Sequence, residues 1–354
     1  MTRAALTRQQ GLSLIELMVA MLISLVLLAG VLQVFLSSKQ LYASNTALAR
    51  IQENGRFAAQ FLSYGLRNAG FKGECVNGIE VRLNVTDEEE QAYNPLYAIE
   101  GWDNGTSPTN LSGTVRAQTD SFSVRSAGNG SEFLTKNGTK TSTPSLNIEG
   151  SHNVEDGEIV LVGSTSGCDL FQNANNGNAS VLQQKGGNVS PGNVSCNGQS
   201  ESCWSSGVEG KYLSIYKLTS ETYFLNDHDD RLPSLSRSRL NDGGSWTKEE
   251  LVEGVIDMQV QYLLEDGDQY ISANSSQLDN EEEWKKIVSA RAYLIVVSSE
   301  TNVVDEARTF FFAPAKGITK EDQYASYADG AVTVKERRLA QVFATTVAIR
   351  NRLP

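Results

Sequence analysis

The amino-acid sequence predicts an α+β fold: a long N-terminal helix, membrane-spanning in its first part and amphipathic in its second, packed on a C-terminal globular domain with an antiparallel β-sheet. Three observations predict this fold. A charge-free apolar run follows a short basic start, apolar residues then recur at helical intervals up to Asn68, and alternating apolar and polar residues fill the C-terminal part of the chain.

The first element is a membrane anchor. Residues 1–11 are polar and basic, and no charged residue stands between Glu16 and Lys39. As a helix, this run can cross about 30 Å of hydrocarbon, and it is longer than the apolar core of a secretory signal peptide. We therefore expect residues 12–36 to span a membrane, with the basic start in the cytoplasm and the rest of the chain on the opposite side.

The helix continues over residues 37–70 as an amphipathic segment. One stripe of apolar residues recurs there at helical spacing: Leu41, Leu48, Ile51, Ala58, Phe61, Leu62 and Leu66. Gly70 suits a left-handed cap, so a helix from Leu12 to Asn68 would be about 85 Å long, and its outer half must pack on the body. Gly30 and Gly55 each lower the stability of the helix by about 1 kcal/mol relative to alanine. They either permit the helix to bend or are tolerated without a role.

The remaining chain, residues 71–354, predicts one β-rich globular domain. Residues 71–210 are variable and loop-rich, with short strand-like runs between stretches of Asn, Gly and Ser, whereas residues 211–354 are better patterned. Ile256–Leu264 alternates as a half-buried strand does. The predicted strands are Ser121–Arg125, Glu158–Val162, Lys211–Leu218, Thr222–Leu225, Ile256–Leu264, Val288–Val297, Ala307–Phe312 and Phe343–Ile349, the last closing an antiparallel sheet over the outer half of the helix.

Four cysteines, an even number in a chain predicted to be exported, indicate two disulfides, for which three pairings are open. We favour Cys196 with Cys203, which closes a short loop, and Cys75 with Cys168, which ties the end of the helix to the body. Free thiols are the alternative. A zinc site is disfavoured because the chain lacks a C-x-x-C pair and its two histidines, His152 and His228, would make a poor ligand set.

The formal net charge of −12 disfavours a nucleic-acid-binding surface. Gly163–Gly167 departs from a G-x-S-x-G elbow at its central Thr165 and is interpreted as a turn, and no phosphate-binding loop is present. We expect neither enzymatic activity nor a cofactor. Carboxylate oxygens of Asp227, Asp229 and Asp230 could bind calcium, but the EF-hand spacing is missing and we favour an exposed acidic turn.

Glu16 is the feature that a plain membrane anchor does not explain, because an ionised carboxylate in a membrane helix costs about 2.5–3.5 kcal/mol. The segment Gln10-Gly11-Leu12-Ser13-Leu14-Ile15-Glu16-Leu17 resembles the class III signal of type IV prepilins. The resemblance implies that a prepilin peptidase cuts between Gly11 and Leu12, removes residues 1–11 as a leader and methylates the new amine of Leu12. The family more often has Phe where this chain has Leu12.

After that cleavage, the carboxylate of Glu16 can neutralise an amine, since it lies one helical turn from Leu12 near the positive end of the helix dipole. In the family that amine is thought to belong to a neighbouring subunit, so the pair would set the register of an incoming subunit. A pair within one chain is the alternative.

Three C-terminal segments are similar to the PilW family of large minor pilins: Tyr223–Leu225, Leu251–Tyr262 and Arg337–Arg352. This resemblance implies a pilin-like fold and a low-copy subunit that helps start type IV pilus assembly and sits at or near the pilus tip, supporting adhesion and twitching motility. The implied partners are other minor pilins, the major pilin, the prepilin peptidase, the inner-membrane assembly platform and, as a candidate, a tip adhesin. Before assembly the implied location is the inner membrane, with a periplasmic C-terminal domain.

Two other functions are compatible with the same leader and helix. One is a pseudopilin of a type II secretion system, although the large body and the PilW-like end favour a pilus subunit. The other is a tip module that binds a ligand through residues 76–210. A membrane-anchored enzyme has no support in the sequence.

Overall fold

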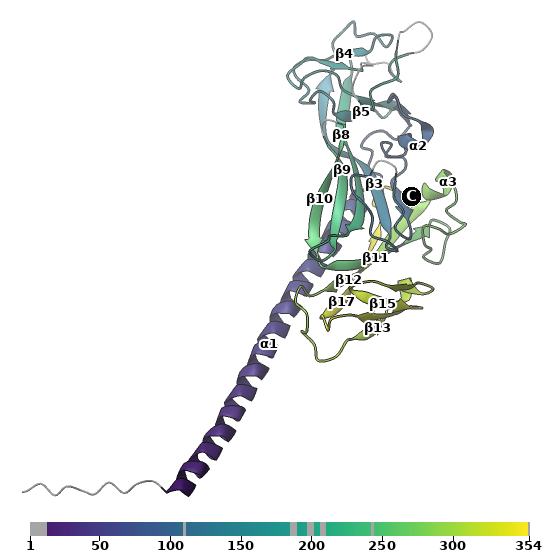
Figure 1. Cartoon of the computed structure of the whole chain (residues 1–354). Helices are drawn as coiled ribbons and strands as arrows, with labels where there is room; N and C mark the ends of the chain where they lie inside the picture. The colour runs from purple at the N-terminus through teal and green to yellow at the C-terminus, as the bar shows by residue number, and fades with distance from the viewer. Residues whose placement is uncertain are drawn as a thin grey trace, which may run out of the picture.

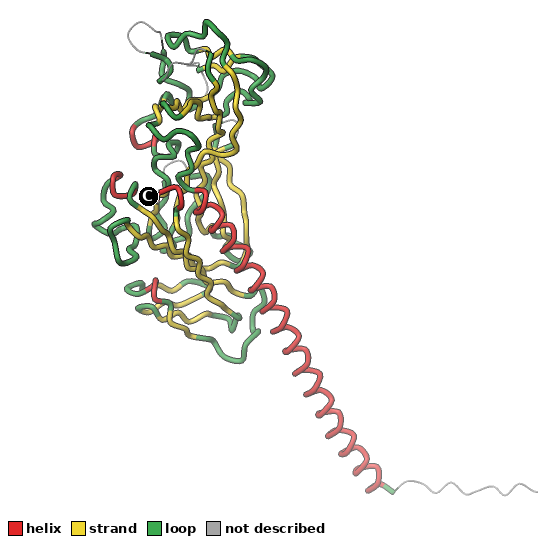
Figure 2. Tube along the Cα trace, turned by 180° about the vertical axis from the view of Figure 1, so that it is seen from behind, coloured by secondary structure: helices red, strands yellow, loops and turns green. Residues whose placement is uncertain are grey.

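The computed structural model of the protein describes residues 13–108, 111–184, 190–196, 202–205, 210–241 and 244–352. A long helix projects from one end of an elongated body built mostly of strands (Figure 1). From behind, the last turns of the helix lie against the body and the rest stands free (Figure 2). The architecture is the predicted α+β arrangement.

Helix α1 (Leu14–Asn68) is one uninterrupted helix of 55 residues. It ends where the sequence predicts, because Gly70 adopts a left-handed conformation (φ 73°) and its N–H donates to the carbonyl of Arg125 at 2.8 Å. The outer half of α1 buries a stripe of small and apolar residues against the body: Ala47, Ile51, Gly55, Ala58, Leu62, Gly65 and Leu66.

A three-stranded antiparallel sheet covers this stripe. Its order is β11 (Val255–Leu264), β12 (Ile287–Val297) and β17 (Ala340–Ala348). Phe343 and Val347 of β17 pack into the same hydrophobic core as the α1 stripe. The predicted closing strand, and its place over the outer half of the helix, are confirmed.

The largest sheet follows the path β1-β6-β5-β8-β3-β2, with β9 also paired to β8 and β10 paired to β9. The β1–β6 pair is parallel and the other pairs are antiparallel. The bounds are β1 (Ile79–Val81), β2 (Ile99–Trp102), β3 (Ser121–Leu134), β5 (Ile159–Ser164), β6 (Gly167–Gln172), β8 (Tyr212–Asn226), β9 (Ser234–Leu240) and β10 (Trp246–Glu253). Strands from both sides of residue 210 therefore share one sheet.

The prediction of two strands, Lys211–Leu218 and Thr222–Leu225, is wrong because one strand, β8, covers both. Ser220 and Glu221, between the two apolar runs, are buried and hydrogen-bonded. Ser220 Oγ donates to the carbonyl of Ala92 at 2.7 Å, and Glu221 accepts from Arg237 at 2.9 Å. Polar partners on neighbouring segments thus allow the strand to continue through a polar stretch.

A small sheet packs on the face of β11 and β12 that lies opposite α1. It has the order β13-β16-β15-β14, with bounds β13 (Thr309–Phe311), β14 (Thr319–Glu321), β15 (Ala325–Ala328) and β16 (Ala331–Val334). Ile256, Ile295 and Val297 of β11 and β12 pack there against Tyr327 and Val332. We call the segment 309–334 the lower sheet.

The lower sheet corrects two predictions. Ile256–Leu264 is not half-buried, because the lower sheet covers the second face of β11 and its polar residues Asp257 and Gln259 are buried. The strand predicted over Ala307–Phe312 exists as β13, which is shorter than predicted and belongs to the lower sheet, where it pairs with β16.

At the other end of the body, β3 and β8 run past the end of α1 into a second core (Figure 1). Phe133, Val160, Phe171, Trp204 and Ile215 pack together there. We call this region, with the two-stranded sheet of β4 (Ser145–Asn147) and β7 (Val181–Gln183), the distal lobe. The short helices are α2 (Asp87–Glu90), α3 (Glu281–Trp284), η1 (Ala313–Ala315) and η2 (Arg350–Arg352).

Candidate assembly surface

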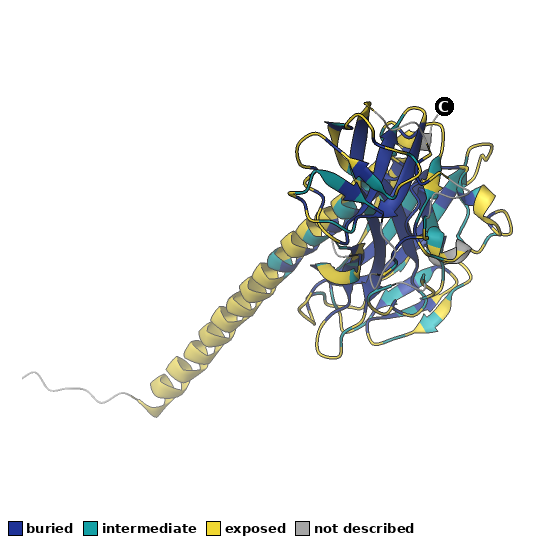
Figure 3. Ribbon diagram, turned by 90° about the horizontal axis from the view of Figure 1, so that it is seen from above, coloured by how far each residue is buried: buried dark blue, intermediate teal, exposed yellow. Residues whose placement is uncertain are grey.

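The inner half of α1 is an apolar surface that the body leaves uncovered. Leu14 is 76% exposed and Phe35 63%, and the most apolar window of the helix buries none of its residues in the body. Figure 3 shows the helix exposed from its start to the point where it meets the body. In the described part of the chain, α1 is the one helix long and apolar enough to cross a membrane.

Glu16 lies in the first turn of this apolar surface. Its Oε2 accepts a hydrogen bond from the backbone N–H of Ser13 at 2.9 Å, so within a single chain the carboxylate caps its own helix. The predicted cleavage and methylation site, Gly11 and Leu12, lies outside the described residues. The pairing of Glu16 with a free amine therefore stays a prediction.

Gly30 and Gly55, two of the three glycines of α1, have different surroundings. A Cβ at Gly30 would have no neighbouring atom within 4 Å, whereas a Cβ at Gly55 would lie 2.2 Å from the ring of Phe343. Gly55 is therefore where the sheet approaches the helix, which gives this glycine a packing role.

Polar contacts fix the body to the outer half of α1 along its length. Nearest the membrane segment, Gln40 Nε2 donates to Asp305 Oδ1 at 2.6 Å, and the exposed pair Arg50–Glu300 follows at 2.5 Å. Farther along, the hydroxyls of Ser63 and Thr345 are 2.7 Å apart. These contacts hold the apolar inner half of α1 in a defined direction relative to the body.

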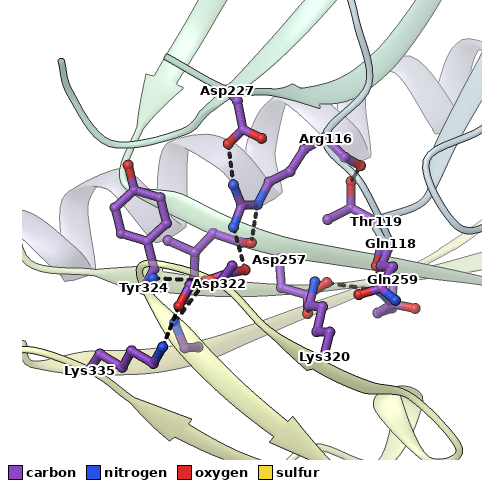
Figure 4. Close-up of polar contacts among 12 residues, drawn as sticks. Arg116, Gln118, Thr119, Asp227, Asp257, Gln259, Lys320, Asp322, Tyr324 and Lys335 are labelled. Atoms are coloured by element: carbon purple, nitrogen blue, oxygen red, sulfur yellow. Dashed lines mark hydrogen bonds and ion pairs between the residues drawn. The ribbon is translucent and has the colours of Figure 1, made fainter. Parts of the chain in front are cut away.

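Arg116 joins three parts of the body in a buried polar cluster (Figure 4). Its Nε donates to the carbonyl of Ile256 at 3.1 Å, one terminal nitrogen pairs with Asp227, and the other pairs with Asp322 at 2.5 Å. The guanidinium also lies over the ring of Tyr324, 5.3 Å from its centre. Because Asp322 and Tyr324 belong to the lower sheet, Arg116 fastens that sheet to the rest of the body.

Asp257 and Lys320 form a second buried contact in this cluster, with 3.9 Å between Nζ and Oδ2. Burial is the main cause that raises the pKa of the Asp257 carboxyl, and the Lys320 ammonium opposes the rise. The other carboxylate oxygen accepts from Gln259 Nε2 at 2.8 Å. Lys320 also lies over the ring of Tyr327 at 4.4 Å, so these groups hold β11 and the lower sheet together.

A buried acid that sequence reasoning missed lies near β11. Asp120 is 5% exposed, and its Oδ2 accepts from the backbone N–H of Val260 at 2.8 Å. Burial, and then the nearby charge of Asp103, raise the pKa of Asp120 well above its ordinary value. The sequence around Asp120 carries no signal that distinguishes it from an exposed loop acid.

The calcium candidates do not converge. Asp227 pairs with Arg116, whereas Asp229 and Asp230 are exposed. Among the residues that the structure describes, no group of three His, Cys, Asp or Glu side chains could hold a metal ion. The histidines have structural partners: His152 is buried and bonded to the carbonyl of Val181 at 3.1 Å, and His228 lies 3.0 Å from the hydroxyl of Ser234.

Both disulfides have the favoured pairing. Cys75–Cys168 ties the segment after α1 to β6, and Cys196–Cys203 closes a short loop of the distal lobe. Gly163–Gly167 forms the turn of the hairpin between β5 and β6, as predicted.

Comparisons with known proteins found two matching family models and a similar solved structure. A family model described as type IV pilus-assembly protein W matches residues 222–351, and one described as prokaryotic N-terminal methylation motif matches residues 6–32. A solved type IV-like pilin from Thermus thermophilus is similar over 86% of this chain and 98% of that chain, with 11% sequence identity and a TM-score of 0.31. No curated protein matches the chain at a significant level.

Proposed function

We propose that the chain is a minor pilin of the PilW family that helps to start pilus assembly and sits at or near the pilus tip, as the family models matched over residues 222–351 and 6–32 support. Its partners would be other minor pilins, the major pilin, the prepilin peptidase and an inner-membrane assembly platform. The family and fold are those of a structural subunit. Before assembly, the body would lie on the periplasmic side of the inner membrane.

The observation that carries this proposal is the uncovered apolar half of α1 with Glu16 in its first turn. In the membrane, lipid covers this surface, and in a filament the helices of neighbouring subunits would cover it. Such a transfer needs no refolding of the body, because the buried stripe of α1 begins only at Ala47.

Glu16 would direct the transfer. In the described chain it accepts one hydrogen bond, from the N–H of its own Ser13, so it can accept further donors. A methylated amine on Leu12 of a neighbouring subunit would supply a cation. Burying either charge alone costs several kcal/mol, so a subunit that enters the filament out of register is disfavoured.

The shape of the body supports a place near the tip. The distal lobe extends beyond the end of α1, on the side away from the membrane segment (Figure 1). A subunit with another body stacked directly above it would need room for this lobe, whereas a terminal subunit has open space there.

The function is tested by mass spectrometry of the mature N-terminus and by Glu16→Ala. We expect a chain that begins at methylated Leu12. The Glu16→Ala chain should be inserted and processed, yet be absent from sheared filaments. Glu53→Ala is the matched control, because Glu53 is the other acidic residue of α1 and lies outside the apolar half. A natural chain that still begins at Met1, or normal incorporation of Glu16→Ala, would refute the proposal.

A further inference from the structure

Strand β17 has an open edge. Within the described chain, β17 pairs with β12 and with no other strand. At its two ends, Ser298 N donates to Leu339 O, and Ile349 N donates to Val288 O, so the odd-numbered residues face β12. The N–H and C=O groups of the intervening residues therefore point outward: Ala340, Val342, Ala344, Thr346 and Ala348. None of these groups makes a backbone hydrogen bond elsewhere in the described chain.

This edge lacks the features that prevent an edge strand from pairing with a strand of another chain. β17 has the sequence Ala-Gln-Val-Phe-Ala-Thr-Thr-Val-Ala, without charge, proline or bulge, and its register with β12 is continuous. The long edge strand β10 differs, because it carries Lys248, Glu249 and Glu250 and has a bulge before Val252. An uncharged, regular edge is a template for pairing with another strand.

The direction of β17 restricts what can pair with it. In the contacts between α1 and the β17 segment, residue numbers rise in the same order in both. Gly55 lies against Phe343, Ser63 contacts Thr345, and Asn351 Nδ2 donates to the carbonyl of Ala69. β17 therefore runs in the same direction as α1, away from the membrane. A second copy anchored in the same membrane would present its own β17 in that same direction, so two β17 edges cannot pair antiparallel.

The position and charge of the edge indicate its occupant. β17 packs directly on α1, whose inner half is the proposed contact surface of the filament, so a subunit packed against α1 would also lie beside this edge. Arg291 of β12 is the cation nearest this part of the edge: its Nε is 3.0 Å from Oγ1 of Thr346, its register partner on β17, and its guanidinium is 4.0 Å from the centre of the Tyr270 ring. A carboxylate on the incoming strand would face this cation.

We propose that the open edge of β17 binds an extended strand of a neighbouring pilin subunit in the same filament. The strand runs toward the membrane, antiparallel to β17, and carries an acidic side chain within reach of Arg291. Backbone hydrogen bonds supply the affinity, and the contact is head-to-tail, as a filament requires. This inference rests on the proposed function, because it needs neighbours that share the same membrane orientation.

The test is Ala344→Pro in the full chain, co-produced with the pilins of its own host. Proline removes one outward N–H and is tolerated on an edge strand. We expect the variant to be inserted, processed and disulfide-bonded, but to enter sheared filaments about tenfold less than the natural chain, as the loss of one to two hydrogen bonds implies. Lys248→Pro is the matched control, since the N–H of Lys248 points away from β9 by the same rule and β10 is not the proposed edge.

Hydrogen exchange provides the second measurement. The outward amides of Val342, Ala344 and Thr346 should exchange fast in the detergent-solubilised chain and become protected in the assembled complex. Normal incorporation of Ala344→Pro, or fast exchange of these amides in filaments, would overturn the edge proposal while leaving the minor-pilin function intact. Absence of the natural chain from filaments would overturn both.

Discussion

Gly55 is the residue at which the packing of α1 on β17 depends on a missing side chain. A Cβ there would lie 2.2 Å from the Phe343 ring, too close for the two to coexist without a shift. We expect Gly55→Ala to lower the free energy of unfolding by about 1–3 kcal/mol, because overpacking outweighs the gain in helix propensity. Denaturant unfolding of the detergent-solubilised chain measures this change.

Gly30→Ala is the matched control for Gly55→Ala. Nothing lies within 4 Å of the added methyl group, so the variant should keep or slightly raise stability. Equal losses in both variants would contradict the packing role of Gly55.

Asp120 makes stability depend on pH. Burial raises the pKa of its carboxyl above the ordinary value of 3.8, so the folded chain binds this proton more tightly than the unfolded chain. Its contribution to stability is therefore larger in mild acid and falls as pH rises through the folded-state pKa. Asp120→Asn keeps an oxygen for the N–H of Val260 and removes the charge.

We expect Asp120→Asn to melt at a higher temperature than the natural chain at pH 7.5, with a smaller difference between pH 5 and pH 7.5. Thermal melts at the two pH values measure it. The exposed Asp229→Asn is the control and should leave the pH dependence unchanged. The idea fails if Asp120→Asn retains the full pH dependence of the natural chain.

At this scale the sequence predicts residues whose role is local. Gly70 could be predicted because a left-handed cap depends on its own backbone. The disulfide between Cys75 and Cys168 was only the favoured one of three open pairings, because it joins residues 93 positions apart. Asp120 and Asp257 could not be predicted, because their burial depends on segments distant in sequence.

Among the elements, the lower sheet depends on Arg116. Its side chain is 6% exposed, and it pairs with Asp227 and Asp322. We expect Arg116→Ala to cost about 3 kcal/mol, because Asp322 loses its partner, and to speed hydrogen exchange in residues 309–334. Arg116→Lys should rescue only in part, since an ammonium cannot reproduce the forked geometry.

The control for this cluster is Arg50→Ala, which breaks a pair whose side chains are 58% and 43% exposed and should cost under about 1 kcal/mol. Unchanged exchange in the lower sheet of Arg116→Ala would show that apolar packing alone holds it.

Elements whose signal lies in their own residues were predicted well. α1 and the strands β11, β12 and β17 follow from periodicity. The wrong predictions about strands share one cause. Alternating residues show that a strand has one polar and one apolar face, but they do not show which other segment covers the polar face. Hence β11 was predicted as half-buried, although the lower sheet lies on its second face. The pairing of β13 likewise depends on a partner that follows it in the chain.

On the scale of the whole molecule, the chain divides into a folded body and an apolar anchor. The first buried residue of α1 is Ala47, so removal of residues 1–36 takes nothing from the core. We expect that truncation to give a water-soluble, monomeric protein with the unfolding midpoint of the body. Size-exclusion chromatography and thermal melting measure it.

Removal of residues 1–56 is the matched comparison. It deletes Ala47, Ile51 and Gly55 and exposes the sheet beneath them, so this protein should aggregate or unfold at lower temperature. If both truncations behave alike, the outer half of α1 is not part of the core.

The membrane anchor and the resemblance to type IV prepilins could be predicted from the sequence. The charge-free run and the motif around Glu16 are each a single uninterrupted segment of the chain. The distal lobe could not, since its core joins Phe133, Phe171 and Ile215 from three separate strands.

The hydrogen bond of 2.6 Å between Gln40 and Asp305 has a mechanical consequence. It joins the loop before β13 to α1 only about 6 Å along the axis from Leu36, the last residue of the predicted membrane segment. The body therefore rests almost on the lipid headgroups and has no stalk. Because this contact lies so close to the apolar segment, we expect the body and the apolar segment of α1 to move together as one rigid piece.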